Sequence, residues 1–419
     1  MENYTSVKMG FGKNKIDVQI PTANLAGVLT PNEVEVALTG EEEVKRAIAN
    51  PIGSERLSKL YKKGAKAVII TSDITRPVPS KYIVPHIIDE LIAGGANYED
   101  ITVVFALGSH RSHTEEEMRY MVGDATFDKV RCIDSSMDKC VNLGTSTRGT
   151  PIDVFDEVAN ADMRICVGNI EYHYFAGYSG GAKAIMPGVS SRAAIQANHS
   201  RMVEPTSVAG KIDGNNVRAD IDEAGKITGI DFIVNVVLNE KKEIICAVAG
   251  HYIEAHREGC KFLDKLYKKE IPEKADIVLV SPGGFPKDIN LYQSQKGLDN
   301  AAHAVRDGGI IILLASAAEG LGEHVFEEWL NEAKCSRDLV DRIQREFKLG
   351  GHKAAAIAMV LERARIFMVS DKDDEFVKNV FLEPYHSVDE AINAAIDALG
   401  KDAKIIAMPY GGSTLPVVK

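Results

Sequence analysis

The chain has 419 residues, of which 45% are hydrophobic and 26% are charged, and its formal net charge is −11. This composition is ordinary for a globular protein long enough for two domains, and its acidity argues against nucleic acid as a main partner. No apolar stretch approaches the roughly 18 residues that cross a membrane. The N-terminus lacks the basic start and apolar run of a signal peptide, so we expect a cytoplasmic protein.

The six cysteines include no C-x-x-C pair, which argues against a zinc ribbon or a thioredoxin-like site. Cys166 and Cys246 lie in apolar runs, where a free cysteine behaves as a small hydrophobic residue. We therefore expect a reduced protein.

Apolar runs alternate with helical patterns through the first half of the chain. Residues 11–20 alternate around an Asn-Lys turn and predict a β-hairpin, and residues 33–49 predict a connector that ends in a helix. A helix that opens at Thr114 has a capping box, because Glu117 follows three residues later. Three buried strands are predicted, each followed by a polar loop, at residues 66–71, 101–107 and 163–170.

Strands that alternate with helices predict a mostly parallel, doubly wound sheet. In such a sheet the ligand lies outside the carboxyl ends of the strands. Several polar side chains that follow the three strands should therefore gather along one edge, namely Asp73, Arg76, His110, Arg111, His173 and Lys183. This convergence is the strongest functional inference that the residues support by themselves.

A second α/β unit is predicted in the last third of the chain. The charged, proline-containing residues 264–274 predict a linker, and residues 290–305 beyond it predict a helix. The strands expected in this unit lie at residues 275–280, 308–314, 364–369 and 403–407.

We therefore expect an α/β fold with two domains that have mostly parallel, doubly wound sheets. The N-terminal domain should cover residues 1–265 and the C-terminal domain residues 275–400. The turn-rich tail, residues 405–419, is expected to return to the N-terminal domain.

A glycine-rich loop runs from His173 to Gly188 and leads into a helix with a serine N-cap. Backbone in a strand–loop–helix arrangement can approach a phosphate or another anion, and Gly180 and Gly181 are the candidate positions for it. Lys183 lies between small residues that leave room for an attached group, and a desolvated lysine becomes a usable nucleophile. The alternative is a surface lysine near a turn.

Each of the other candidate residues also has a structural alternative. His110 and His173 could form an acid/base pair or be two structural histidines. Arg76 could bind a carboxylate bidentately or pair with Asp73. His199 could ligate a metal or face the last carbonyls of its helix.

Three further features are open at this point. Arg111 could bind a carboxylate or a phosphate, and His113 is expected at the surface in a first helical turn. Tyr292, Gln293 and Lys296 share a polar helix face, which could close the crevice from the second domain or face solvent.

Together these motifs resemble those of the nickel-dependent lactate racemases and their 2-hydroxyacid racemase and epimerase relatives. The resemblance covers nearly the whole chain, and the block from His173 to Gly188 is its most specific part. The matching segments are residues 72–77, 108–111, 173–188, 198–199, 235–237, 292–297 and 409–414.

The resemblance implies a cofactor, the nickel-pincer nucleotide (pyridinium-3-thioamide-5-thiocarboxylic acid mononucleotide), tethered to Lys183 through a thioamide. It implies that His199 completes the nickel coordination and that His110 and His173 are the two acid/base groups. The remaining implied roles are cofactor contacts from Asp73, Arg76, Gly180 and Gly181, and substrate contacts from Arg76, Tyr292, Gln293 and Lys296. It also implies a site in the cleft between two α/β domains, and cofactor-biosynthesis proteins as maturation partners.

The implied reaction is racemisation or epimerisation of a lactate-like 2-hydroxy acid by reversible hydride transfer to the cofactor, with one histidine for each face. Lactate-specific members close a tryptophan over the substrate, but the matching stretch here, residues 349–355, has none, and Trp329 lies earlier. His352 and Lys353 in that stretch could face a longer or more hydroxylated acid, or form a surface helix N-terminus. Alternatives are a non-catalytic binding homologue and a pyridoxal phosphate enzyme that uses Lys183.

Overall fold

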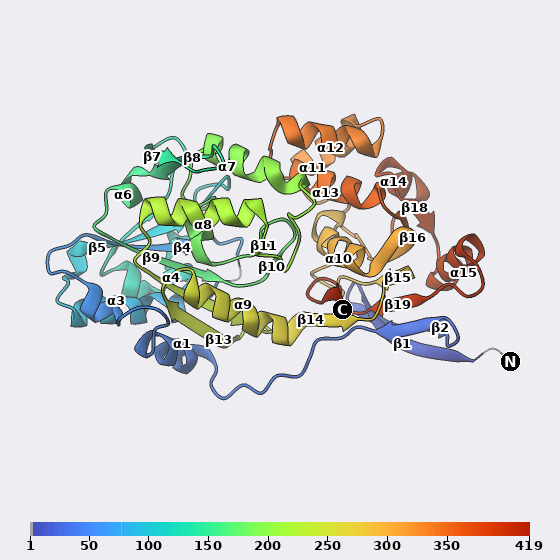
Figure 1. The fold of residues 1–419 in the computed structure, drawn as a ribbon, viewed down its shortest axis with the longest axis horizontal. Coiled ribbons are helices and arrows are strands. Elements are labelled where there is room, and N and C mark those ends of the chain that lie inside the picture. The colour runs from blue at the N-terminus through green and yellow to red at the C-terminus, as the bar shows by residue number, and fades with distance from the viewer. Residues whose placement is uncertain (1–2, 77) are drawn as a thin grey trace. The chain divides into compact units, whose positions relative to one another are not determined.

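The computed structural model describes residues 3–76 and 78–419, which divide into two compact units (Figure 1). The central unit comprises residues 34–265, and the terminal unit comprises residues 3–33 together with 266–419. Pro77, which ends the expected Asp-x-Thr-Arg-Pro motif, lies outside the described residues.

A six-stranded sheet organises the central unit, with the order β13-β12-β9-β4-β5-β6. All neighbouring strands are parallel except β12 and β13, which pair antiparallel. The strands are β4 (Ala67–Ser72), β5 (Ile101–Ala106), β6 (Arg131–Asp134), β9 (Met163–Asn169), β12 (Phe232–Leu238) and β13 (Ile244–Gly250). The three buried strands predicted in the first half of the chain are therefore confirmed as β4, β5 and β9.

Helices pack against this sheet, and short antiparallel strand pairs lie in the connections between its strands. Apolar side chains of α1 and α3 pack on the β4, β5, β9 and β12 strands, whose residues are almost wholly buried. The helices of eight or more residues are α1 (Gly40–Ala49), α3 (Val84–Ala93), α4 (Glu115–Val122), α7 (Arg192–His199), α8 (Asn216–Thr228) and α9 (Glu254–Tyr267, which runs across the unit boundary). The short elements are α2 (Leu57–Leu60), η1 (Ser80–Tyr82), η2 (Tyr98–Asp100), α5 (Asp124–Phe127), β7 (Cys140–Thr145), β8 (Pro151–Phe155), α6 (Asp156–Ala159), β10 (Tyr172–His173), β11 (Gly177–Tyr178), η3 (Gly181–Ala184) and η4 (Ser200–Val203).

The terminal unit has its own six-stranded, fully parallel sheet with the order β18-β17-β16-β15-β19-β3. One face packs against the hairpin β1–β2 and helix α15. The strands are β1 (Tyr4–Phe11), β2 (Asn14–Pro21), β3 (Leu25–Val28), β14 (Lys268–Ile271), β15 (Ala275–Val280), β16 (Val305–Leu314), β17 (Arg365–Val369), β18 (Glu383–Tyr385), β19 (Ile405–Met408) and β20 (Leu415–Val418). The helices are α10 (Leu291–Ala304), α11 (His324–Glu332), α12 (Ser336–Arg345), α13 (Gly351–Leu361), α14 (Asp374–Asn379) and α15 (Val388–Leu399).

The expected domain composition is wrong at both ends of the chain. Strand β3 pairs with β19, so the first residues of the chain belong to the terminal unit and not to an N-terminal domain over residues 1–265. The tail, residues 405–419, likewise stays in the terminal unit, because β19 pairs with β15 and β20 pairs with β14. Pairing between distant strands leaves no periodic mark in the sequence, and for this reason the sequence did not reveal it.

The predicted linker at residues 264–274 is also wrong. This segment contains the end of helix α9 and the strand β14, which is parallel to β20. Its lysines and glutamates suggested a solvated connector, but β14 belongs to a two-stranded ribbon in which three of its four residues are at least partly exposed. Charged residues suit such a strand because no large sheet covers them.

The N-terminal hairpin is longer than predicted, and its turn lies earlier. Strands β1 and β2 pair along their whole length, with Phe11 opposite Asn14. The turn is therefore Gly12-Lys13 and not Asn-Lys, because Gly12 takes up the left-handed conformation (φ 53°) that the tight turn requires.

None of the described helices is both long and apolar enough to cross a membrane. The six cysteines are free thiols; Cys166 is buried in β9, whereas Cys246 in β13 is only partly buried.

Candidate active site

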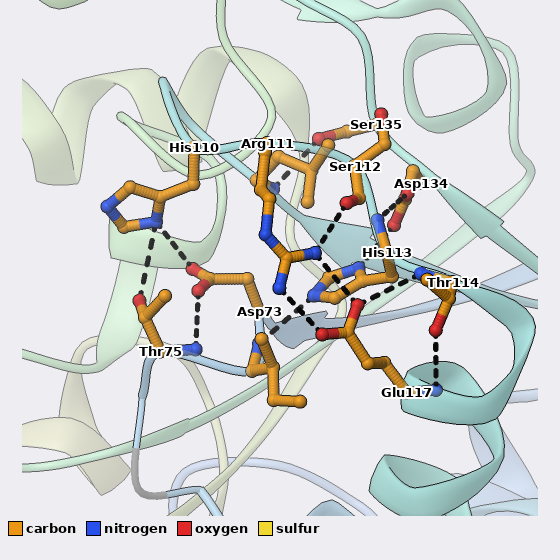
Figure 2. Close-up of polar contacts among 12 residues, drawn as sticks. Asp73, Thr75, His110, Arg111, Ser112, His113, Thr114, Glu117, Asp134 and Ser135 are labelled. Atoms are coloured by element: carbon orange, nitrogen blue, oxygen red, sulfur yellow. Dashed lines mark hydrogen bonds and ion pairs between the residues drawn. The ribbon is translucent and has the colours of Figure 1, made fainter.

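Two strand ends bring Asp73 and His110 together (Figure 2). Asp73 follows β4 and His110 follows the neighbouring strand β5, and the Nδ1 nitrogen of His110 lies 3.0 Å from Oδ2 of Asp73. The other carboxylate oxygen of Asp73 accepts the Thr75 backbone N–H at 2.7 Å. Burial opposes ionisation of Asp73, but the hydrogen bonds from His110 and Thr75 outweigh it and lower the pKa of Asp73 to about 2.

The ionised Asp73 fixes the tautomer of His110. A carboxylate only accepts hydrogen bonds, so the neutral His110 ring carries its proton on Nδ1 and its lone pair on Nε2. The ring is 18% exposed, so its outer edge is accessible. A histidine oriented by a carboxylate in this way is arranged as a general base.

The side chain of His113 forms a hydrogen bond with the loop that carries Asp73. The prediction of a surface position for His113 is wrong. Its side chain is only 1% exposed, and its Nδ1 nitrogen lies 2.6 Å from Oδ1 of Asp134 at the end of β6. Its Nε2 nitrogen accepts the backbone N–H of Ile74 at 3.1 Å. The imidazole ring of His113 therefore joins the segments that end β4, β5 and β6. The ring of Phe105 contacts it edge-on.

The two arginines of these loops have different surroundings. Arg111 forms a bidentate ion pair with Glu117, with N–O distances of 2.8 and 2.6 Å, and this pairing supports neither a carboxylate nor a phosphate role for it. Arg76 is exposed, and among the described residues no carboxylate side chain forms an ion pair with its guanidinium. The structural alternative for Arg76 was a salt bridge with Asp73, and the described residues do not form it.

The glycine-rich loop is shaped by polar residues beneath it. Asn235 of β12 accepts the Gly181 backbone N–H at 2.7 Å, and the buried Arg218 of α8 donates to the carbonyls of Ala176 (3.1 Å) and Tyr178. Gly180 has φ 76°, and a Cβ there would lie 2.7 Å from the Asn235 Oδ1 atom.

A Cβ at Gly181 (φ 61°) would lie 3.0 Å from the ring of His256. Protein neighbours and backbone conformation therefore require glycine at both positions. The expected contact of Gly180 and Gly181 with a cofactor stays a prediction.

The ring of Phe175 is the common neighbour of three candidate residues. The ring centroids of His173 and His199 lie 4.5 and 4.9 Å from it, both edge-on, and the Lys183 Nζ atom lies 5.7 Å from its centroid. Phe175 itself is 2% exposed. The structure thus gathers His173, Lys183 and His199 from the loop, the short helix η3 and the end of α7.

Two ionisable groups of the loop, Lys183 and His173, are partly buried, and their pKa values are shifted towards the neutral forms. Burial lowers the pKa of Lys183 well below its ordinary value, and the positive charges of Arg218 and Arg76 lower it further. Burial likewise lowers the pKa of His173, with added contributions from Lys183, His199 and Arg76. A neutral lysine amine is a nucleophile, and a neutral imidazole can accept a proton.

His199 is 5% exposed, and its Nδ1 nitrogen lies 2.8 Å from the side-chain oxygen of Asn198. In the described residues, no group of three or more histidine, cysteine, aspartate or glutamate side chains is arranged to hold a metal ion. A metal at His199 would therefore need most of its ligands from a cofactor, as the resemblance implies.

The candidate substrate residues of the terminal unit lie in the first turns of helix α10, whose N-cap is Asn290. Gln293 and Lys296 are exposed and Tyr292 is partly buried. Lys353 contacts this turn, since its Nζ atom donates to the Tyr292 carbonyl at 2.7 Å and lies 3.9 Å from the centre of the Tyr292 ring.

His352 and Lys353 do not form a surface helix N-terminus, because they are only 8% and 7% exposed. The Nδ1 nitrogen of His352 accepts the Gly350 backbone N–H at 3.0 Å. Trp329, although distant in sequence, lies against the same helix start, where a Cβ at Gly351 would be 2.4 Å from its indole ring. The indole is completely buried, so it serves as core packing.

Sequence reasoning did not predict the roles of three residues that shape this region, namely His113, Phe175 and Arg218. The signal for Phe175 was present, because it lies two residues after His173 in the glycine-rich block. Arg218 lies in an amphipathic helix, and nothing in its neighbours marks it as the donor to a distant loop.

Two family models match the chain. The lactate racemase N-terminal domain matches residues 11–210, and the lactate racemase C-terminal domain matches residues 271–416. The chain is 34% identical to a lactate racemase of Thermoanaerobacterium thermosaccharolyticum over 98% of its own length and 99% of the relative's. It is 32% identical to a lactate racemase of Lactiplantibacillus plantarum, with 97% and 98% covered.

Solved structures agree with these sequence matches. The lactate racemase apoprotein of Thermoanaerobacterium thermosaccharolyticum superposes with a TM-score of 0.89 at 33% identity, over 98% of this chain and 100% of that one. A Thermotoga maritima protein shares the fold, with a TM-score of 0.63 at 19% identity over 91% of this chain and 100% of that one. The chain therefore belongs to the lactate racemase family and is an isomerase of the racemase type.

Proposed function

We propose that this protein racemises or epimerises a 2-hydroxy carboxylic acid, with lactate as the first substrate to test. The observation that carries the proposal is the grouping of His173, His199 and Lys183 around Phe175. A candidate base, a candidate metal ligand and an amine whose pKa is lowered by burial have no joint packing role. Together they suit a tethered metal cofactor beside a proton acceptor.

The residues present fit the nickel-pincer nucleotide. Lys183 would hold it covalently, because burial and nearby cations favour the neutral amine that forms such a bond. His199 would supply the protein's nitrogen ligand to nickel. When bound, the cofactor supplies a reversible acceptor for the hydrogen on C2 of the substrate.

The two histidines would handle the proton of the substrate hydroxyl. On His110 the lone pair lies on Nε2, because Asp73 accepts the Nδ1–H. His173 is kept neutral by burial and by neighbouring cations, so it can accept a proton on the opposite face. A racemase needs one such group for each face, since the hydroxyl of each enantiomer points a different way.

Arg76 is the candidate for the substrate carboxylate. Its charge contributes to the lowered pKa values of both His173 and Lys183, and its side chain is exposed. A guanidinium binds a carboxylate with two parallel hydrogen bonds. Roles for Tyr292, Gln293 and Lys296 in substrate binding stay part of the proposal.

The size of the substrate is proposed to depend on Lys353 rather than on His352. Lys353 contacts Tyr292 directly, whereas His352 binds the backbone of its own helix start. A cation at this position favours an acid longer than lactate with a further polar group. Comparing lactate with longer and polyhydroxylated 2-hydroxy acids, in the wild type and in Lys353→Met, would test this preference.

The experiment for the proposal as a whole is intact-protein mass and nickel content after co-expression with the cofactor-making enzymes. We expect an added mass and about one nickel per chain, and the added mass should disappear in Lys183→Ala. Racemisation followed by circular dichroism should disappear with it.

Wild-type protein without adduct or nickel, under conditions that load a known lactate racemase, would contradict the cofactor proposal. Retained affinity for a hydroxy acid without turnover would instead favour a binding homologue. A borohydride-reducible absorption band without nickel would favour pyridoxal phosphate at Lys183.

A further inference from the structure

We propose that Asn198 and Asp220 are positioning residues that fix which ring nitrogen His199 presents to a metal. The inference rests on the proposed function for the identity of that metal. Its structural basis is a chain of buried hydrogen bonds within the central unit, which runs from Asp220 through Asn198 to His199.

The side-chain amide of Asn198 can take only one orientation. Its Nδ2 nitrogen lies 3.2 Å from the Val217 carbonyl oxygen and 2.9 Å from Oδ2 of Asp220. Both partners only accept hydrogen bonds, so a flipped amide would set its oxygen against two other oxygens. Asn198 is completely buried, and no bulk water is present to relieve such a contact.

Asp220 is itself held by a dense set of donors. The hydroxyls of Ser146 and Thr150 lie 2.5 and 2.6 Å from its two carboxylate oxygens, and Asp220 is 1% exposed. Ser146 cannot turn away easily, because its oxygen also accepts the backbone N–H groups of Arg148 and Thr150 at 3.3 and 3.2 Å. The turn between β7 and β8 is thereby joined to helices α7 and α8.

This network determines the tautomer of His199. With its Nδ2 committed to acceptors, Asn198 turns its Oδ1 oxygen towards His199 Nδ1 at 2.8 Å. The Nδ1 nitrogen must then carry the proton, and the Nε2 nitrogen carries the lone pair that a metal binds. Partners that hold the second nitrogen of a metal-binding histidine orient the ring and raise its basicity as a ligand.

The test reads the tautomer in protein without cofactor. Protein with ¹⁵N-labelled histidine is examined by two-bond ¹⁵N–¹H correlation, which separates protonated from lone-pair ring nitrogens. The chain has 11 histidines, and comparison with His199→Gln identifies the signal of His199. We expect a single tautomer with the proton on Nδ1.

Two variants test the chain of hydrogen bonds. Asn198→Ala should allow both tautomers of His199. Asp220→Asn should also admit the second tautomer, because an amide can donate as well as accept and no longer excludes the flipped Asn198. The matched control is Asn24→Ala in the terminal unit, which removes a buried asparagine that donates to the carbonyls of Lys401 and Ala403.

An Nε2–H tautomer of His199 in the wild type would overturn the proposal. The proposal would also fail if Asn24→Ala changed the His199 signal as much as Asn198→Ala does. The wild-type spectrum decides the tautomer even where Asn198→Ala fails to fold, and Asp220→Asn then carries the variant arm. An unchanged single tautomer in Asp220→Asn would remove Asp220 from the network.

Nickel retention gives the second measurement. After loading, Asn198→Ala should keep the mass adduct on Lys183 but bind nickel about 10- to 100-fold more weakly than the wild type. Unchanged nickel affinity would overturn the positioning role. A wild type that never acquires the adduct would overturn both the proposed function and the nickel role of His199. The tautomer spectrum of unloaded protein tests the hydrogen-bond network separately, so the two failures can be distinguished.

Discussion

His110 and His173 are the two candidate acid/base groups, and their surroundings are of opposite character. His110 pairs with the ionised Asp73 at 3.0 Å, and its ring is 18% exposed. His173 contacts the aromatic rings of Tyr174 and Phe175, and the charges that lower its pKa are all positive. Among the described residues, no carboxylate forms an ion pair with His173.

This difference shows that one fold can prepare two bases by different physical means. At His110 a carboxylate selects the tautomer and stabilises the ring once it takes a proton. At His173 burial and repulsion keep the ring neutral, and a proton that it accepts must be passed on readily. Two of these cations, Arg218 and Arg76, also lower the pKa of Lys183, so the surroundings of His173 and the expected attachment point form one electrostatic environment.

The largest expected effect is the loss of either histidine. His110→Ala and His173→Ala should each lower racemisation by about 10²- to 10⁴-fold in both directions, because each face of the substrate needs its own proton acceptor. The measurement is circular dichroism with each enantiomer as the starting material, on protein with confirmed mass adduct.

His386→Ala is the control for that experiment, since His386 is exposed, lies 3.7 Å from Asp374 and belongs to the terminal unit. Unchanged turnover in either of the other two variants would remove that histidine from the mechanism and end the comparison between them.

Asp73→Asn should sharpen the comparison with a loss of about 10²-fold. An asparagine can turn its amide N–H towards Nδ1 of His110, which reverses the tautomer and takes the lone pair from Nε2. The mass adduct and the nickel content should stay as in the wild type. Full activity in Asp73→Asn would mean that His110 does not depend on the carboxylate.

The Asp73–His110 pair should also be visible in acid stability. The pKa of Asp73 is lowered from 3.8 to about 2, so folding favours its ionised form. The resulting stabilisation, on the order of 2 kcal/mol, is fully present above the unfolded pKa and is lost as the pH falls through the folded pKa. Urea unfolding at pH 6 and at pH 2.5 should show the gap between wild type and Asp73→Asn closing in acid, and a constant gap would contradict this account.

The smallest expected effect concerns the contribution of Lys183, one of the residues that lower the pKa of His173, to the stability of the folded protein. Because burial lowers the pKa of Lys183, the unfolded chain binds a proton there more tightly than the folded chain does, and this costs stability below pH 10.5. Unloaded Lys183→Met should therefore unfold at higher urea than the wild type at pH 7. The difference should shrink as the pH rises to the ordinary lysine pKa, 10.5.

A matched control for that comparison is Lys261→Met, an exposed lysine on α9 that pairs with Glu258. It should change the urea midpoint little. A destabilised Lys183→Met at pH 7 would contradict a stability cost from the lowered pKa of Lys183.

The expected proximity of Asp73 and His110 is confirmed, because strand order alone was enough to predict it. Asp73 and His110 follow two buried apolar runs, and the rule that parallel strands end at one edge brought them together before any contact was known. The same reasoning failed at His113, whose ring bonds to Ile74 39 residues away. It also failed for the domain limits, because β3 pairs with β19 from the far end of the chain.

The sequence by itself determined the α/β class, the buried strands and the set of polar residues at their ends. These follow from hydrophobic periodicity, which is a local property that neighbouring residues carry. Only the tertiary structure decided the partners of Nδ1 in His110 and His199, the lowered pKa of Lys183 and the central place of Phe175. Each depends on the orientation of a partner far along the chain, such as Asp220 with Ser146 74 residues away, and such pairings have no period that a sequence displays.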